Sequence, residues 1–222
     1  MFLKLVKEVI EAKDAKSFFF APSEKFTWQP GQYAYITLGK ITKQFTIANS
    51  PTEEFIQITT RIRKESEFKQ NLDSLEIGSE IESRAPFGAF IIDKNITNNI
   101  FLAGGIGITP FRSMIKYNID NKLGIKMTLI YSNSDSDHVF KRELDKWQKE
   151  NDFIKIEYID TSLVGRIDKL KILEFIGNCK LEIKNCMFWS VGPNTFANAM
   201  EDILDEMKIP QDRVKTEKFI GY

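Results

Sequence analysis

The hydrophobic pattern of this chain changes its period near Asp93, and that change limits the possible folds more than any other feature. Before Asp93, apolar and polar residues alternate in short runs, as half-buried strands require. Between residues 54 and 63, for example, Ile56, Ile58 and Ile62 would face the same side of a strand. Turn formers such as Pro30-Gly31 separate the runs. The first half is therefore predicted to be an antiparallel β-barrel or sandwich with one helix over residues 66–75.

After Asp93, short apolar runs alternate with amphipathic stretches of helical period. The predicted strands cover residues 100–103, 127–131, 154–159, 187–191 and 214–219. The predicted helices cover residues 110–118, 140–150, 168–176 and 195–207. This alternation indicates a doubly wound, five-stranded parallel α/β sheet. With the Asn-rich segment 93–99 as the boundary, the expected domains are residues 1–95 and 96–222.

The composition excludes several classes of partner. The 31 Lys and Arg residues balance 31 Asp and Glu residues, whereas a protein that binds duplex nucleic acid carries a basic excess. No apolar run approaches the roughly 20 residues of a membrane span, and the N-terminus does not resemble a signal peptide. Two cysteines, Cys179 and Cys186, favour a cytoplasmic location and are too few for the common iron–sulfur clusters. We expect no nucleic-acid partner and no membrane span.

A glycine-rich stretch, FLAGGIGITPFRSM, follows the first predicted strand of the second half and opens its first helix. In open α/β sheets this position binds ligands, because the helix start presents unpaired N–H groups that suit a pyrophosphate. Gly104, Gly105 and Gly107 would admit a ligand to the backbone, with Thr109 at the helix cap and Pro110 in its first turn. The spacing fits neither the Gly-x-Gly-x-x-Gly fingerprint nor the P-loop, so a plain strand–helix turn stays open.

The succession of GQYAYITL, KQFTIANSP, RAPFGAFI, FLAGGIGITPFRSM, LIYSNS, WSVGPNTF and EKFIGY resembles the ferredoxin–NADP⁺ reductase family over nearly the whole chain. The resemblance implies an FAD-binding barrel followed by an NAD(P)-binding α/β domain. It also implies an oxidoreductase that transfers hydride from NADH or NADPH to FAD. Since the chain has no iron–sulfur motif, electrons would pass to a separate protein or a small molecule.

The family's flavin motif, Arg-x-Tyr-Ser/Thr-x-x-Ser, corresponds here to residues 43–49. By this resemblance Lys43 neutralises the FAD pyrophosphate, Phe45 packs beside the flavin, and Thr46 hydrogen-bonds near its N5 as a catalytic residue. Gln44 lies within the same motif. Lys43 in place of Arg loses the bidentate fork, so looser FAD retention is expected. Read in isolation, Lys43 and Phe45 would be ordinary strand residues.

The next strand and helix supply the remaining residues that the resemblance assigns to FAD: Thr60, Arg61, Ile62, Lys69 and Gln70. The family's glycine at the start of this helix is missing, because Ser66 and Glu67 stand there. An alternative is that Arg61, Arg63, Lys64 and Lys69 form a solvated basic face. FAD binding requires some of them to turn inward.

Two further motifs of the resemblance lie in the second half. Gly192 and Pro193 match the family's Cys-Gly-Pro turn, with Val191 where a Cys often stands, and would bind the dinucleotide. Near the C-terminus, Glu217 matches a catalytic acidic position. Phe219 or Tyr222 would cover the flavin ring where nicotinamide must bind. A core-filling role for Phe219 is an equal alternative.

The choice between NADH and NADPH is weakly encoded. Asp160 ends the third predicted strand, where an acid can bind a ribose 2′-hydroxyl, while Ser162 and Arg166 nearby suit a 2′-phosphate. Asp135 after the second strand would repel that phosphate, so NADH is slightly favoured. His138, the sole histidine, lacks partners for a metal site, and none is expected.

Two competing functions stay open. One is an NAD(P)H:flavin reductase that uses flavin as a substrate, which Lys43 and the missing glycine favour. The other is a non-catalytic electron-transfer or regulatory subunit.

Overall fold

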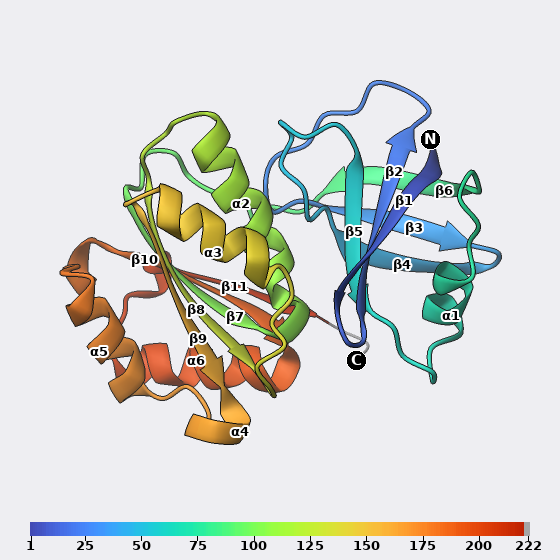
Figure 1. Cartoon of the computed structure of the whole chain (residues 1–222). Coiled ribbons are helices and arrows are strands. Elements are labelled where there is room, and N and C mark those ends of the chain that lie inside the picture. The colour runs from blue at the N-terminus through green and yellow to red at the C-terminus, as the bar shows by residue number, and fades with distance from the viewer. Residues whose placement is uncertain (220–222) are drawn as a thin grey trace. The chain divides into compact units, whose positions relative to one another are not determined.

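The computed structural model describes residues 1–219 and divides into two compact units. The first unit contains Met1–Ile92 and Thr109–Asp120. The second begins with Asp93–Ile108 and continues from Asn121. Each unit has its own sheet and its own core, so each is described separately (Figure 1).

The first unit is an antiparallel six-stranded sheet in the order β4-β3-β6-β1-β2-β5. Its strands are β1 (Phe2–Ala12), β2 (Ala15–Pro22), β3 (Tyr33–Leu38), β4 (Ile41–Thr46), β5 (Ile56–Arg61) and β6 (Glu80–Phe87). A bridge between Ile47 and Ile58 joins the two edges just beyond β4, so the sheet curls into a barrel. The helix α1 (Glu67–Asp73) follows β5.

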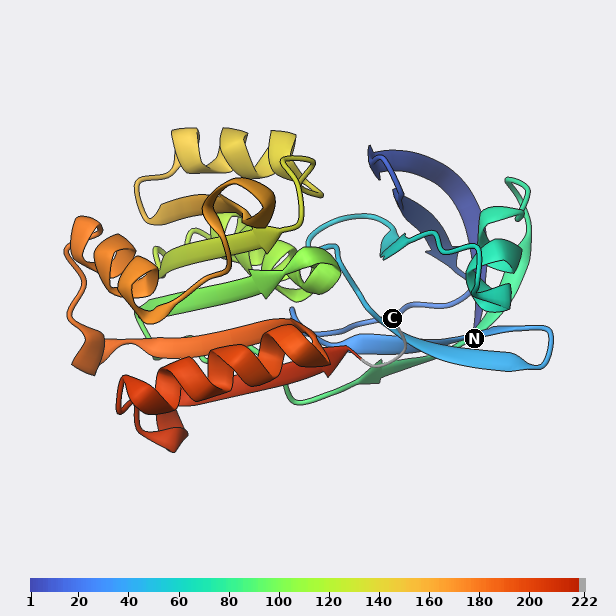
Figure 2. The same cartoon turned by 90° about the horizontal axis from the view of Figure 1, so that it is seen from below.

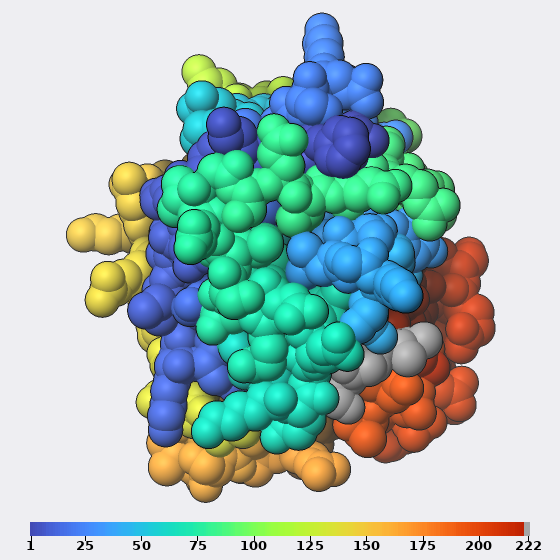
Figure 3. Space-filling model, turned by 90° about the vertical axis from the view of Figure 1, so that its right-hand side faces the viewer, coloured from blue at the N-terminus to red at the C-terminus, as the bar shows by residue number. Residues whose placement is uncertain are grey.

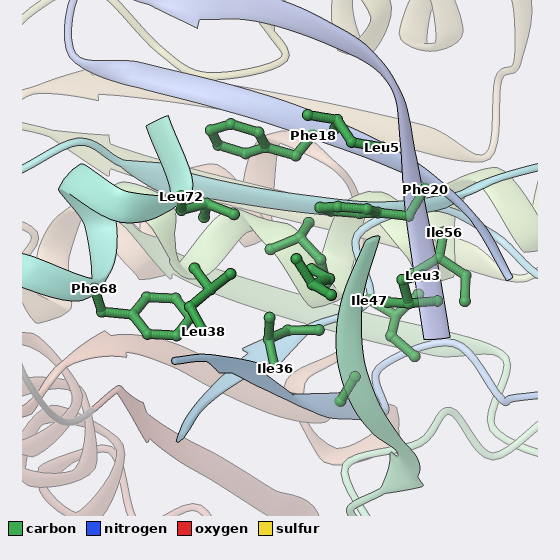
Figure 4. Close-up of a cluster of buried hydrophobic side chains, with 13 residues drawn as sticks. Leu3, Leu5, Phe18, Phe20, Ile36, Leu38, Ile47, Ile56, Phe68 and Leu72 are labelled. Carbon is green, nitrogen blue, oxygen red and sulfur yellow. The ribbon is translucent and has the colours of Figure 1, made fainter. Parts of the chain in front are cut away.

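Inward-facing apolar residues from all six strands fill the barrel core. Figure 4 shows Phe18 and Phe20 of β2 meeting Ile36 and Leu38 of β3 around a common centre, with Phe68 of α1 beside them. Successive inward residues lie two apart, which is the period that the alternating sequence predicts. Burial of this alternating set therefore fixes the register of the strands.

The second unit is a parallel five-stranded sheet in the order β11-β10-β7-β8-β9. Its strands are β7 (Asn98–Gly104), β8 (Lys126–Asn133), β9 (Ile154–Asp160), β10 (Met187–Pro193) and β11 (Val214–Phe219). Its helices are α3 (Lys141–Glu150), α4 (Thr161–Val164), α5 (Lys169–Asn178) and α6 (Asn194–Glu206), with short 3₁₀ turns η1 (Gly105–Ile108), η2 (Ile183–Asn185) and η3 (Gln211–Arg213). Figure 2 shows α3 and α6 on opposite faces of the sheet, which is the predicted doubly wound arrangement.

The central strands of this sheet are buried on both faces, which explains their continuous apolar runs. On one face, Ile100 and Leu102 of β7 pack with Ile172 of α5 and with Met200 and Leu204 of α6. All five strands and four long helices predicted for this half are present, within three residues at each end. The short helix α4 was not predicted.

Two details of the first unit differ from the sequence prediction. The apolar alternation also predicts a strand over residues 87–92. This prediction is wrong, because β6 ends at Phe87 and Gly88 adopts a positive φ of 99°. Phe90 instead packs against Phe111 of α2 (Thr109–Asp120), with ring centroids 6.1 Å apart. The helix α2 itself groups with the barrel unit, although it lies in the chain between two parts of the second unit.

No helix among the described residues is both long and apolar enough to cross a membrane.

Candidate functional site

A buried lysine lies among other cations on the first unit. Lys69, in α1, is only 7% exposed. Burial, and then repulsion from Arg63, Arg61 and Lys43, lowers the pKa of Lys69 to about 8, against a partial opposing effect of Asp14. Figure 3 shows this face, with the α1 segment in green beside strands β3 and β4 in lighter blue. A buried cation that its neighbours repel is the electrostatic signature of an anion-binding site.

The four basic residues of this segment do not behave alike. Lys69 turns inward, and Arg61 is half-buried and forms an ion pair with Asp14. Arg63 and Lys64 are exposed. The solvated-face interpretation therefore holds for Arg63 and Lys64 and fails for Lys69 and Arg61.

The start of α1 carries a side-chain cap. Ser66 is the N-cap, and its hydroxyl accepts the N–H of Lys69 at 3.4 Å. Glu67 adds a negative charge to the first turn. The cap engages one N–H group of this short helix and Glu67 repels anions, so the cationic side chains are the main groups that this face offers to a phosphate.

The flavin-motif residues lie on both faces of β4. Lys43 is opposite Ile36 and Phe45 is opposite Ala34, so both point to the barrel side. The Phe45 ring is stacked on Phe68, with centroids 5.5 Å apart. Thr46 points to the other face and is 7% exposed.

The other first-unit candidates surround this strand end. Thr60 is buried at the end of β5, and Ile62 donates its backbone N–H to the carbonyl of Asp14 at 2.6 Å. Gln44 and Gln70 are exposed, and the Gln70 amide donates to the carbonyl of Arg63 at 3.1 Å.

In the second unit, the chain order reverses between β7 and β10. From β7 it proceeds outward through β8 and β9, and it then returns to β10 and β11 on the other side. Ala103 and Val191 are neighbours in the two central strands, so the glycine turn and Gly192-Pro193 leave the same edge of the sheet. Such a switch point at the carboxyl ends of parallel strands is where open α/β sheets bind ligands.

The glycines of the turn have different physical roles. A Cβ at Gly104 would lie 2.6 Å from the Phe196 ring, and one at Gly107 would lie 2.6 Å from the Val191 carbonyl carbon. These two glycines therefore permit close packing of the turn on β10 and α6. Gly105 is different, because its φ is 55° and the nearest atom to its missing Cβ is Asn133 Oδ1 at 4.0 Å. Of the three, Gly105 alone leaves open space at the backbone, so ligand access does not explain Gly104 or Gly107.

The helical path also begins earlier than predicted. Residues Gly105–Ile108 form η1, and α2 continues from it at Thr109. Thr109 is buried and lies a full turn inside this path, as does Pro110. The expected cap role of Thr109 is therefore wrong, and the N–H groups at the start of the path belong to η1.

Glu217 lies on β11 opposite Val191. Its Oε2 is buried without a hydrogen-bond partner in the described part of the chain, and burial raises the pKa of Glu217 to about 7. Phe219 ends the same strand opposite Pro193 and is half-buried. Tyr222 lies outside the described residues.

Three contacts near these residues were not predicted from the sequence: Asp14 with Arg61, Asn133 beside Gly105, and Arg112 with Glu53. Arg112 gave a usable signal, because it is a charged residue on the apolar face of a predicted helix. Within the described residues, no cluster of His, Cys, Asp or Glu could hold a metal ion. His138 is buried with its ring edge-on to Tyr131 and Tyr158.

Residues 101–202 match the family model of the oxidoreductase NAD-binding domain. The chain is 25% identical over 237 residues to flavohemoprotein A of Dictyostelium discoideum, covering 96% of this chain and 58% of that protein. It is 26% identical over 236 residues to the glycine betaine monooxygenase reductase subunit of Pseudomonas aeruginosa, covering 98% and 63% respectively. The chain thus spans less than two thirds of the length of these relatives.

Solved structures share the fold. The FAD/NAD-binding domain of nitric oxide dioxygenase from Vibrio cholerae aligns with a TM-score of 0.84 at 18% identity, covering 98% of each chain. Ferredoxin–NADP⁺ reductase from Plasmodium falciparum aligns with a TM-score of 0.81 at 19% identity, covering 98% of this chain and 95% of that one. The predicted architecture, an antiparallel barrel followed by a parallel α/β sheet, is confirmed.

The buried charge of Lys69 is expected to cost stability. Since its folded-state pKa lies below the unfolded value of 10.5, the unfolded chain binds more protons between about pH 8 and 10.5, and stability rises with pH across that window. Lys69→Met should raise the free energy of unfolding at pH 7 by about 1–2 kcal/mol, after allowance for solvent screening, and the gain should shrink by pH 10.

Urea unfolding at both pH values measures this difference, with Lys64→Met, at an exposed site, as the matched control. A Lys69→Met protein that is less stable than wild type at pH 7 would contradict the assignment.

Proposed function

The chain is ferredoxin–NADP⁺ reductase-like, and we propose that it is an FAD-dependent oxidoreductase that takes hydride from NAD(P)H and passes electrons to a separate acceptor. The observation that carries the proposal is Lys69, a buried cation that its cationic neighbours repel. Since a charge that is both buried and close to like charges is costly, such a residue supports a bound anion at this place. On a barrel unit joined to an oxidoreductase NAD-binding domain, the diphosphate of FAD fits that requirement.

The first-unit residues would hold FAD as follows. Lys43, Arg61 and Lys69 neutralise the two phosphates, and Gln70 at the exposed side of α1 offers a further donor. Thr60 and Ile62 present strand-end backbone groups. Phe45, already stacked on Phe68, provides an aromatic wall. Together with Gln44 these residues belong to the proposed flavin domain, residues 1–95.

The dinucleotide would bind at the switch point of the second unit, in the proposed domain of residues 96–222. The N–H groups of η1 around Gly105 suit its pyrophosphate. Gly104 and Gly107 keep the turn close to β10, while Thr109 and Pro110 continue the helix beneath it. Gly192 and Pro193 border the same edge.

When bound, FAD supplies the group that accepts the hydride and later releases its electrons. The task of the chain is to orient the two cofactors and to place polar groups at the reacting atoms. Thr46 offers a hydroxyl donor at the end of β4. Glu217, with a pKa near 7, can hold or release a proton at its carboxylate as charge changes nearby. Phe219 or Tyr222 would occupy the nicotinamide position when the dinucleotide is absent.

The acceptor would be another protein or a small molecule. The relatives named above are a flavohemoprotein and the reductase subunit of a monooxygenase, and these names support a haem or oxygenase component as the class of acceptor. A cytoplasmic location is proposed from the two free thiols, Cys179 and Cys186.

A second candidate has a specific observation in its favour. The Ser66 cap engages one N–H group at the start of α1, and Lys43 stands where the flavin motif has its bidentate arginine and is exposed. Both features favour exchangeable flavin, and hence an NAD(P)H:flavin reductase that uses flavin as a substrate.

Anaerobic titration with NADH and with NADPH tests the proposal. Purified protein supplied with FAD should lose its flavin absorbance at about 450 nm as the donor is added. Protein that elutes colourless from gel filtration yet reduces added flavin would indicate the flavin reductase. Flavin that stays oxidised with both donors would indicate a non-catalytic subunit and reject the enzymatic proposal.

Thr46→Val tests the proposed catalytic donor. The change keeps the side-chain volume but removes the hydroxyl, so the rate constant of flavin reduction should fall about tenfold or more while the melting temperature changes little. Thr42→Val, an exposed position on the same strand, is the control. Wild-type reduction kinetics in Thr46→Val would exclude the role.

NADH is the proposed donor because an acid ends β9. The Asp160 carboxylate accepts hydrogen bonds from the Ser162 N–H at 3.0 Å and from the Ser162 hydroxyl at 2.6 Å, so Ser162 is already engaged by an anion. A 2′-phosphate there would meet the Asp160 charge, whereas a ribose hydroxyl would meet an acceptor.

Asp160→Ala should therefore raise the affinity for NADP⁺ relative to NAD⁺ by at least about tenfold, as measured by calorimetry. Asp152→Ala, exposed just before the opposite end of β9, should leave the ratio unchanged. An unaltered ratio in Asp160→Ala would place the donor specificity elsewhere.

A further inference from the structure

A buried ion pair on α2 has no part in the chemistry proposed above. Arg112 is 5% exposed, and its guanidinium contacts both carboxylate oxygens of Glu53, with Nη1–Oε2 at 2.6 Å and Nη2–Oε1 at 3.1 Å. The same group donates to the carbonyl oxygen of Ala48 at 3.3 Å. The next residue, Ser113, donates its hydroxyl to the carbonyl oxygen of Asn49 at 2.6 Å.

These partners all lie in one short segment, residues 48–53, which begins two residues after Thr46. Within it, Glu53 also accepts the backbone N–H of Ser50 at 2.7 Å. Thr52 donates its hydroxyl to Asp120 at the far end of α2. Residues near both ends of α2 therefore form hydrogen bonds with residues 48–53, which overlap the end of the flavin motif.

Stability alone does not explain this arrangement. Removing the Arg112 charge from water is costly even beside a half-buried Glu53, and a well-packed apolar side chain of similar volume stabilises a core as well or better. A bidentate arginine adds geometry, because its planar fork fixes the angle and the register of the two elements that it joins. The contacts therefore specify where α2 lies along residues 48–53.

The N-terminus of α2 is continuous with the glycine turn. Ile108 ends η1 and Thr109 begins α2, so the two share a peptide bond. A 12-residue helix moves as one piece, and Arg112 lies one turn beyond that bond. A ligand that shifts η1 therefore pulls on the contacts of Arg112 and Ser113.

We propose that Arg112 and Ser113 are positioning residues that couple dinucleotide binding at the glycine turn to the placement of residues 46–53, which begin within the flavin motif and extend beyond it. The inference rests on the proposed function for the identity of the ligand. Neither residue needs to contact a cofactor, since the coupling acts through α2. Occupancy of the turn thereby helps to set the position of Thr46.

Hydrogen–deuterium exchange tests the coupling without turnover. Added NAD⁺, with NADP⁺ in parallel, should slow amide exchange in residues 104–108 and also in residues 46–53 of the wild-type protein. Arg112→Met should keep the first protection and lose the second. Lys116→Met is the matched control, because it removes an ion pair with Asp120 in the same helix and should keep both.

A kinetic measurement adds a second readout. At saturating donor, Arg112→Met should reduce flavin at least about tenfold more slowly, while the dinucleotide Kd changes less than about threefold. Arg112→Lys and Ser113→Ala keep the helix packing closer to wild type, and should show the same loss of protection to a smaller degree if Arg112→Met does not fold.

The outcomes separate the two proposals. Wild-type protection confined to residues 104–108 overturns the coupling and leaves the proposed function standing. If neither dinucleotide protects the turn, the proposed function fails and the coupling fails with it. Retention of both protections in Arg112→Met also overturns the coupling.

Discussion

The close pairing of β7 with β10 is the contact on which the second unit depends. The chain reverses its order between these two strands, so the switch point at their carboxyl ends exists only if they lie side by side. Gly107 against the Val191 carbonyl and Gly104 against Phe196 allow that approach. The glycines thus serve packing first, and the ligand-accessible backbone at Gly105 is a consequence of it.

The first unit contains two buried cations, Arg112 and Lys69, whose charges lie in different electrostatic surroundings. Arg112 is neutralised within the protein by Glu53 and by backbone carbonyls, so its charge fixes one element on another. Lys69 lies close to other cations, and Asp14 only partly offsets their repulsion, so the buried positive charge of Lys69 is destabilising. A buried cation among like charges is the arrangement that a bound anion would stabilise.

Most of the fold could be predicted because the apolar patterns are strong where burial is complete. The runs at residues 100–103 and 187–191 became β7 and β10, since parallel strands buried on both faces are apolar throughout. The strand expected over residues 87–92 is absent because the backbone turns away from the sheet at Gly88. The pattern of apolar residues carries no signal for that turn. At the candidate site, the sequence indicated the types of residue but not the direction in which each side chain points. Nothing local distinguishes inward Lys69 from exposed Lys64, and the partners of Arg112 lie 59 and 64 residues away.

The self-capped start of α1 has a consequence for how an anion is held there. Backbone N–H groups at a helix start keep their partial charge at any pH and hold an anion through directional hydrogen bonds. Side-chain cations lose their attraction as ionic strength rises, because mobile counterions screen them over about 8 Å at physiological salt. With Ser66 as the cap and Glu67 in the first turn, a phosphate on this face would be held mainly by side-chain cations. Its occupancy would therefore fall as the salt concentration rises.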